Sequence, residues 1–167
     1  LKRSAGVRLE LASLYFGRGQ FNTALDEIKL AIQADPNYGA AFNLSGLIYA
    51  SLGNGAQAEA SFRRALQIYR DTGHPQGESV ALLALGRLAR RRRQFDRANE
   101  AFRRALELAT QVGAQREIAL AREFMAEVEL ASADEAFVRP GWAGTEVSDD
   151  QRYFNVNLAR TPYSTWA

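Results

Sequence analysis

Few residues of this chain have the types and spacing that catalytic or metal chemistry needs. The sequence has one histidine, His74, and no cysteine, so it offers no pair of imidazole ligands, no thiolate and no histidine-based triad. It also lacks the glycine-rich loops that cradle phosphates. We therefore expect no enzyme activity, no catalytic residues, no metal and no cofactor. We interpret His74 as a solvated residue in a Gly/Pro connection.

Two clusters of charge are the remaining candidates for chemistry. The run Arg90–Arg93 is the stronger one. It could attract phosphate or an acidic partner, or it could be the solvated end of a helix, where cations complement the helix dipole. We favour the solvated helix end, because the run lacks the interleaved aromatic residues that stack bases. Glu146, Asp149 and Asp150 are expected to face solvent in a loop rather than to hold calcium.

Composition adds little to these candidates. The chain has 167 residues, 21 Lys and Arg against 19 Asp and Glu, and a net charge of +2, which is too small to indicate nucleic acid. No run approaches the roughly 18 apolar residues of a membrane helix. The chain begins at Leu1 rather than at a methionine, which we interpret as an excerpt or a processed form.

The elements that must position these residues repeat along the chain. One skeleton occurs three times, first with an offset of 34 residues and then with one of 40. Its matched positions are Ala12, Gly46 and Gly86; Ala24, Ala58 and Ala98; and Ile28, Phe62 and Phe102. We assign these residues to helix packing, with the small ones allowing close approach. A period of this length indicates a helical solenoid, which presents long surfaces for binding.

Apolar residues at three- and four-residue steps predict seven helices joined by Gly, Pro or Asn connections. The predicted ranges are about 3–17, 23–34, 38–52, 56–70, 77–92, 96–112 and 116–132. Asn22 and Asn37 are the predicted N-caps of the second and third helices. Asp35 and Pro36 end the second helix, because a residue that precedes proline is pushed out of the helical region.

These helices give a repeat array over residues 1–133, with repeats at about 5–38, 39–72 and 79–112. The helix at about 116–132 has no partner and is expected to cap the array. Residues 134–167 form a non-repeat tail that is irregular but rich in aromatic residues, unlike a disordered linker. We expect the tail to dock on its own groove or on another subunit through Trp142, Tyr153, Phe154, Tyr163 and Trp166.

The repeated pattern resembles the tetratricopeptide repeat (TPR) family, with its Leu-Gly, Tyr, Ala, aromatic and Pro signature. The resemblance covers about residues 5–133. It implies an all-α, right-handed superhelical solenoid of three helix pairs, a capping helix and an irregular C-terminal tail. The chain departs from the signature at Arg8, where a large apolar residue belongs, and at Ser45, which replaces a Leu. Only the first copy keeps the closing proline, Pro36.

Two more specific resemblances concern parts of the array. Residues 9–66, with the stretches 15–21 and 34–49, look like the TPR lipoproteins of bacterial type IV pilus biogenesis. Around residues 69–78 the chain instead resembles the 40-residue TPRs of adaptor and regulatory proteins. The first resemblance implies a periplasmic or membrane-associated protein; otherwise we expect a cytoplasmic one.

If the first helix of each pair turns one face to its partner, the opposite face lines a groove. We predict an apolar floor toward the N-terminus and a basic end near Arg87, whose guanidinium suits a carboxylate. TPRs that clamp a chain-terminal carboxylate use Lys where this chain has Leu9, so that mode is not expected. The predicted groove residues are Leu9, Ser13, Phe16, Asn43, Leu47, Ala50, Leu83, Arg87, Arg90 and Arg91.

We therefore predict a protein–protein interaction scaffold or adaptor that binds an extended segment of a partner protein, in the assembly of a larger complex. The alternative is a regulatory protein in which a peptide or a small effector enters the groove and changes the curvature of the array. Nucleic-acid binding through Arg90–Arg93 is the reading we favour least.

Overall fold

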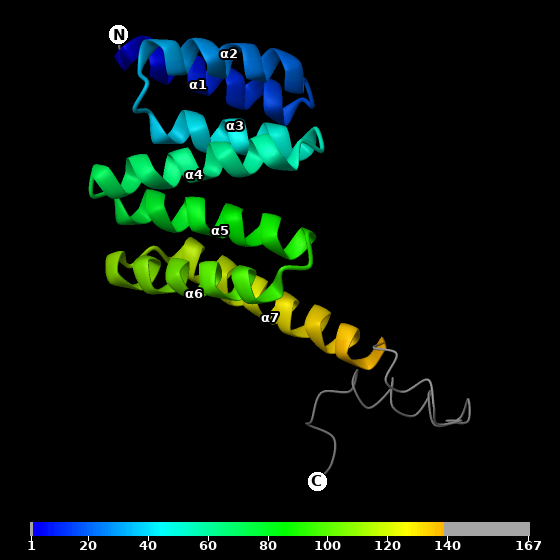
Figure 1. The fold of residues 1–167 in the computed structure, drawn as a ribbon. Coiled ribbons are helices and arrows are strands. Elements are labelled where there is room, and N and C mark those ends of the chain that lie inside the picture. The colour runs from blue at the N-terminus through cyan, green and yellow to red at the C-terminus, as the bar shows by residue number, and fades with distance from the viewer. Residues whose placement is uncertain (1, 139–167) are drawn as a thin grey trace. The chain divides into compact units, whose positions relative to one another are not determined.

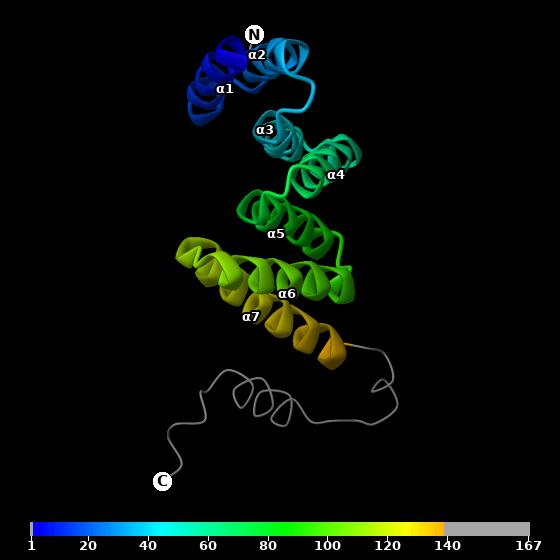
Figure 2. The same cartoon turned by 90° about the vertical axis from the view of Figure 1, so that its left-hand side faces the viewer.

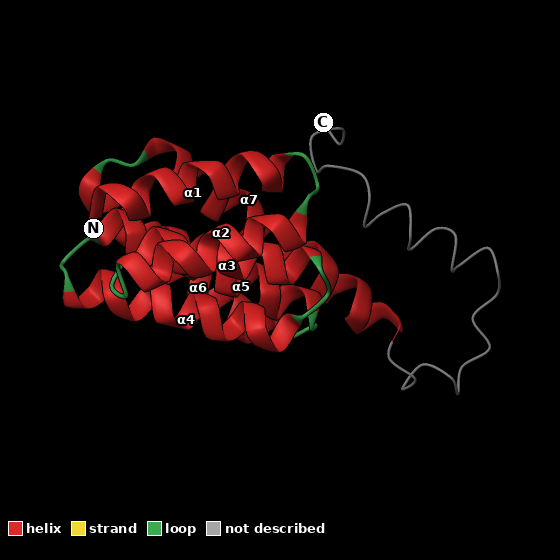
Figure 3. Cartoon of the chain, turned by 90° about the horizontal axis from the view of Figure 1, so that it is seen from above, coloured by secondary structure: helices red, strands yellow, loops and turns green. Residues whose placement is uncertain are grey.

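A computed structural model describes residues 2–138 of the chain, and all regular structure in that range is helical (Figures 1 and 3). This confirms the predicted all-α fold. The helices are α1 (Lys2–Gly17), α2 (Phe21–Ala34), α3 (Gly39–Ser51), α4 (Gly55–Asp71), α5 (Pro75–Arg91), α6 (Phe95–Val112) and α7 (Gln115–Val138). The boundary between two units of the chain falls after residue 132, within α7.

Within residues 2–132 the helices pack as successive pairs. The most extensive contacts join α1 to α2, α3 to α4 and α5 to α6, and the pairs meet through α2–α3 and α4–α5 (Figures 1 and 2). Buried apolar side chains form three clusters along this stack rather than one centre. Each pair buries its apolar faces against its neighbours, as expected of a solenoid.

The small residue of each first helix lies against the large residue of the second. A Cβ atom built on Gly46 would lie 2.4 Å from Cε1 of Phe62, so only glycine fits there. In the first pair, the residues at the matched positions are both aliphatic, Ala12 and Ile28, and both are fully buried. The predicted close approach of paired helices is therefore confirmed.

Tyr69 fills the space between the second and third pairs. A Cβ atom on Gly39 would lie 2.9 Å from its ring, and one on Gly77 would lie 2.4 Å from it, so both glycines are needed where α3 and α5 begin. Burial raises the pKa of the Tyr69 hydroxyl, and the nearby Tyr38 adds to this shift. An aromatic side chain thus ties one repeat to the next.

The two departures from the repeat signature are compensated by polar contacts. Arg8 donates a hydrogen bond from Nη1 to Oε2 of Glu27 on α2, at 2.7 Å, and so replaces apolar packing with an ion pair. Ser45 is buried, and its hydroxyl lies 3.3 Å from that of Ser61 on α4. Glu27 and Ser61 occupy matched positions, 34 residues apart. Each unusual residue therefore has a partner on the facing helix.

The turns within the pairs use left-handed backbone. Gly19, which follows α1, has φ 73°, and Gly53, at the matched position after α3, has φ 80°. The third copy places Arg93 there, with φ 59°. This conformation costs a residue with a Cβ atom about 1–2 kcal/mol. The guanidinium of Arg93 lies over the ring of Phe95, at 5.6 Å from its centroid.

Both predicted N-caps are wrong. Helix α2 begins at Phe21 and α3 at Gly39, and neither preceding residue donates or accepts a capping bond through its side chain. The backbone N–H of Asn37 instead bonds Oδ1 of Asp35, which closes the turn after α2. His74, interpreted from the sequence as merely solvated, caps α5: its Nδ1 accepts the N–H of Gly77 at 2.9 Å.

Helix α7 is longer than predicted, ending at Val138 instead of Ser132. Residues 133–138 contain no glycine or proline, so nothing in them breaks a helix. Its buried residues Ala121 and Val128 follow Ala81 and Leu88 of α5 by 40 residues. Helix α7 thus occupies the position of the first helix of a fourth repeat.

Candidate functional site

Two neighbouring pockets lie along the first helices of the successive repeats. The first has a volume of about 370 Å³ and lies among α1, α3, α4 and α5. The second, of about 330 Å³, lies among α3, α5 and α7. They share three residues, Leu47, Ala84 and Arg87, so they form one continuous groove. We call the residues that line either pocket the groove.

The floor of the groove is apolar. Phe16 of α1, Leu47 of α3 and Leu120 of α7 line it, and all three are only partly buried. Each of these helices has apolar residues on a second face, in addition to the face that packs against its partner helix. This second face lines the groove. Half-buried apolar surface in a groove is suited to an apolar side chain of a ligand.

The basic end predicted near Arg87 lies in this groove. Arg87, Arg91 and Arg116 line it, and Glu117 is the one carboxylate among its lining residues. The guanidinium of Arg87 lies 5.3 Å from the ring centroid of Phe124, a cation–π contact that holds it in place. An acidic ligand group would therefore meet a positive surface with at least one pre-positioned guanidinium.

One of the residues that line the groove, Asn43, has a buried acceptor without a partner. Its Oδ1 is fully buried and accepts no hydrogen bond from the part of the chain that the structure describes. Asn43 lines the second pocket, beside Leu47 and Arg87. A buried polar atom without a partner costs about 1–3 kcal/mol.

Seven of the ten predicted groove residues line the two pockets: Phe16, Asn43, Leu47, Ala50, Leu83, Arg87 and Arg91. The other three lie outside both pockets. Leu9 packs against the core cluster of α1–α3, and the hydroxyl of Ser13 donates to the carbonyl of Leu9 at 2.9 Å. Arg90 pairs with Glu127 of α7. Whether the groove residues contact a partner stays a prediction.

Helix α7 supplies four of the groove residues that the sequence reasoning missed. Arg116, Glu117, Leu120 and Phe124 line the second pocket, although this helix was expected only to cap the array. The sequence does hold a signal for two of them. Leu120 and Phe124 follow the groove residues Val80 and Ala84 by the same 40 residues that separate the second and third repeats.

The arginine run does not form one basic patch. Arg90 pairs with Glu127 and Arg92 with Glu59, whereas Arg91 lines the groove. Successive residues of a helix point about 100° apart, so neighbours in the sequence face different elements. The run is therefore more than a solvated helix end, because two of its members tie α5 to α4 and α7.

The other candidates add no site within the described residues. The predicted tail docking residues, Trp142, Tyr153, Phe154, Tyr163 and Trp166, and the acidic residues 146, 149 and 150 lie outside them. In residues 2–138, no three His, Cys, Asp or Glu side chains gather where they could hold a metal ion. No helix there is both long and apolar enough to cross a membrane.

Comparison with known proteins agrees with this architecture. The profile of the tetratricopeptide repeat family matches residues 37–111. The first TPR domain of Spaghetti (RPAP3), solved with the HSP90 peptide SRMEEVD, has a TM-score of 0.66 at 21% identity and covers 80% of this chain and 96% of its own. The Sgt2 TPR domain of Aspergillus fumigatus has a TM-score of 0.69 at 15% identity and covers 87% and 89%. At these identities the structures show the fold alone.

Two further likenesses are narrower. PilW, a type IV pilus biogenesis factor, has 16% identity and a TM-score of 0.38, so the resemblance to pilus proteins stays a prediction. An inorganic triphosphatase of Acetivibrio thermocellus is 43% identical over 42 residues, which are 25% of this chain and 27% of that protein. The chain thus spans about a quarter of this relative. Residues 37–111 belong to the tetratricopeptide repeat family, and the described helices have its solenoid fold.

Proposed function

We propose that the groove binds an extended segment of a partner protein, and that the chain serves as a scaffold in the assembly of a larger complex. The observation that carries this proposal is the continuity of the two pockets through Leu47, Ala84 and Arg87. A continuous groove fits an extended chain better than it fits a compact small molecule. The RPAP3 TPR domain supports the proposal, because it shows that this fold accommodates a peptide.

The chemistry of the groove defines the segment. Arg87, Arg91 and Arg116 favour an acidic side chain, which a guanidinium can bind with two parallel hydrogen bonds. The apolar floor near Phe16 and Leu47 favours an apolar residue beside it. The side-chain amide of Asn43, which lines the second pocket, would turn toward the segment and hydrogen-bond its backbone. The ligand is thus a segment that combines apolar and acidic residues.

Selection from a phage-displayed library of short linear peptides tests the proposal. The unmodified chain should enrich peptides with an acidic residue near an apolar one, and the Leu47→Glu/Arg87→Glu variant should enrich none of them. The matched control is Leu30→Glu/Arg103→Glu, which makes the same chemical changes at exposed positions of α2 and α6 outside the groove. Equal enrichment on all three proteins, each with unchanged helicity, would refute the proposal.

A variant without residues 134–167 addresses the predicted docking of the tail. If the tail occupies the groove of its own or another subunit, its removal should raise the affinity of the selected peptides. A synthetic peptide of residues 150–167 should then compete with them. Unchanged affinity on removal would exclude a tail that blocks the groove.

A further inference from the structure

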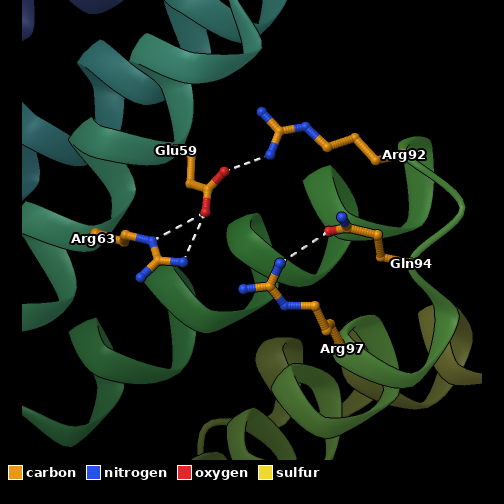
Figure 4. A network of polar contacts seen from close by, with 5 residues as sticks. All are labelled: Glu59, Arg63, Arg92, Gln94 and Arg97. Carbon is orange, nitrogen blue, oxygen red and sulfur yellow. Dashed lines mark hydrogen bonds and ion pairs between the residues drawn. The ribbon is translucent and has the colours of Figure 1, made fainter.

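A second concave site lies apart from the groove, between α4, α5 and α6. Its volume is about 230 Å³, and it shares only Leu88 with the groove. Its floor is made of leucine and alanine side chains, among them Leu66 and Leu85. Its polar residues are Glu59, Arg63, Arg92, Gln94 and Arg97, shown in Figure 4. We call it the arginine pocket.

One carboxylate serves two of the three arginines. Arg63 donates from Nε and Nη2 to Oε1 of Glu59, at 3.1 and 2.8 Å, and Arg92 pairs with Oε2 of the same residue (Figure 4). These bonds, that of Arg92 foremost, hold the pKa of Glu59 below its usual value. Three guanidiniums against one carboxylate leave a net charge of +2 (3 − 1) on the pocket.

Arg97 is the arginine left over from this pairing. Its Nη1 donates to the neutral Oε1 of Gln94 at 3.3 Å, and no carboxylate among the described residues pairs with it. Helix α6 begins at the pocket, directly after Gln94, and has no side-chain cap on its free N–H groups. Its dipole adds to the positive potential there. The pocket therefore has donors in excess of its own acceptors.

The repeat framework does not require this arrangement. Between the first and second repeats, the residues matched to Glu59, Arg92 and Arg97 are Leu25, Leu52 and Gln57. That junction holds an apolar pair where this one holds an ion pair. The helices stack at both junctions. The charges of the arginine pocket thus go beyond what the fold needs.

We propose that the arginine pocket binds the phosphate group of a small organic phosphate. The phosphate dianion would take donors from Arg97 and share Arg92 with Glu59, since guanidinium and phosphate match in geometry and charge. The apolar floor would accept the organic group attached to the phosphate. This site is separate from the groove, so it stands whether or not the groove binds a peptide.

Isothermal titration of the full chain with inorganic phosphate and with phenyl phosphate, at low ionic strength, tests the proposal. Phenyl phosphate should bind more tightly, because only it can use the apolar floor. Arg97→Ala should weaken its binding about tenfold, the loss expected for one charge-assisted contact. Glu59→Gln should tighten it, because the carboxylate competes with the ligand for Arg63 and Arg92.

The matched control is Arg103→Ala, which removes the same charge from an exposed position of α6 outside the pocket. It should leave binding within about twofold of the unmodified chain. An equal loss in Arg103→Ala and Arg97→Ala would overturn the proposal, because net charge alone would then explain it. Equal affinity for the two phosphates would exclude the organic ligand, and weaker binding by Glu59→Gln would exclude the arginines as its donors.

Discussion

A Cβ atom on Gly86 would lie 2.4 Å from Cε1 of Phe102, so glycine on α5 and phenylalanine on α6 fit only as a pair. Replacing Gly86 with Ala should lower the free energy of unfolding by about 1–2 kcal/mol, because overpacking outweighs the gain of about 1 kcal/mol in helix propensity. The double variant Gly86→Ala/Phe102→Ile copies Ala12 and Ile28 of the first repeat. It should be more stable than the sum of the single changes predicts, with a coupling of about 1 kcal/mol or more.

Urea unfolding of the four proteins measures this coupling. Gly6→Ala is the matched control, since nothing lies within 4 Å of a Cβ atom at Gly6 of α1. That change should stabilise the chain by up to about 1 kcal/mol. Additive effects in the Gly86 and Phe102 cycle would show that the two positions do not constrain each other.

The ion pair of Arg8 and Glu27 can be replaced by the residue types that the third repeat has at the matched positions. The matched residues of that repeat are Leu82 and Ala101. Arg8→Leu alone should destabilise the chain, because Glu27, with a side chain only 16% exposed, would lose its partner. Arg8→Leu/Glu27→Ala should recover that loss or exceed it, as apolar replacements of buried pairs often do. Thermal unfolding decides the point, and a double variant less stable than the single one would contradict it.

Glu59 should contribute to the acid sensitivity of the fold. Hydrogen bonds from Arg92 and then Arg63 lower its folded pKa below the ordinary value of 4.5. A lowered folded pKa means that the contribution is complete above the ordinary value and is lost as the pH falls through the folded pKa. Glu59→Gln should cost about 0.5–1 kcal/mol at neutral pH, because the pair is partly exposed, and little below the folded pKa.

Urea unfolding across this pH range, with Glu10→Gln as an exposed control on α1, measures the effect. The two stability curves, of the unmodified chain and Glu59→Gln, should converge on acidification. Curves that stay parallel down to the folded pKa would mean that the Arg92 and Arg63 bonds do not favour the ionised carboxylate.

Replacing Asn43 should stabilise the free chain and weaken its binding of peptides. Asn43→Leu removes the buried unsatisfied oxygen, so the free chain should gain about 1 kcal/mol in free energy of unfolding. Peptides selected on the unmodified groove should bind this variant more weakly, because their backbone loses the Asn43 amide as a hydrogen-bonding partner. Asn99→Leu, on α6 away from the groove, controls for the change in polarity. A variant that is destabilised, or that binds these peptides equally well, would remove Asn43 from the proposed site.

The repeat offsets predicted what depends on periodicity. Matched positions such as Ala24 and Ala58, which must be small and buried in every copy, were assigned correctly to packing. The helix starts were not, because Asn22 and Asn37 have the right chemistry for caps but the backbone enters each helix at another residue. Such choices depend on how the preceding turn closes, which no spacing rule records.

The groove was predictable to the same degree. Its apolar floor could be predicted from the helical spacing of the residues. The sequence could not show which of Arg90 and Arg91 lines the groove, because the ion pair of Arg90 with Glu127 determines this. The arginine pocket was not predicted at all. It joins Glu59 to Arg92 across 33 residues, and neither position belongs to the repeated skeleton.

The register of α7 has a consequence for building with this array. Because Leu120 and Phe124 continue the groove at the same offset as the third repeat, the last described helix is half of a fourth repeat. An engineer who wished to lengthen the binding surface would not need to remove a terminator. A single second helix, grafted after residue 132 with an aromatic-and-alanine face, would replace the last residues of α7, complete the unit and leave α1–α6 in place.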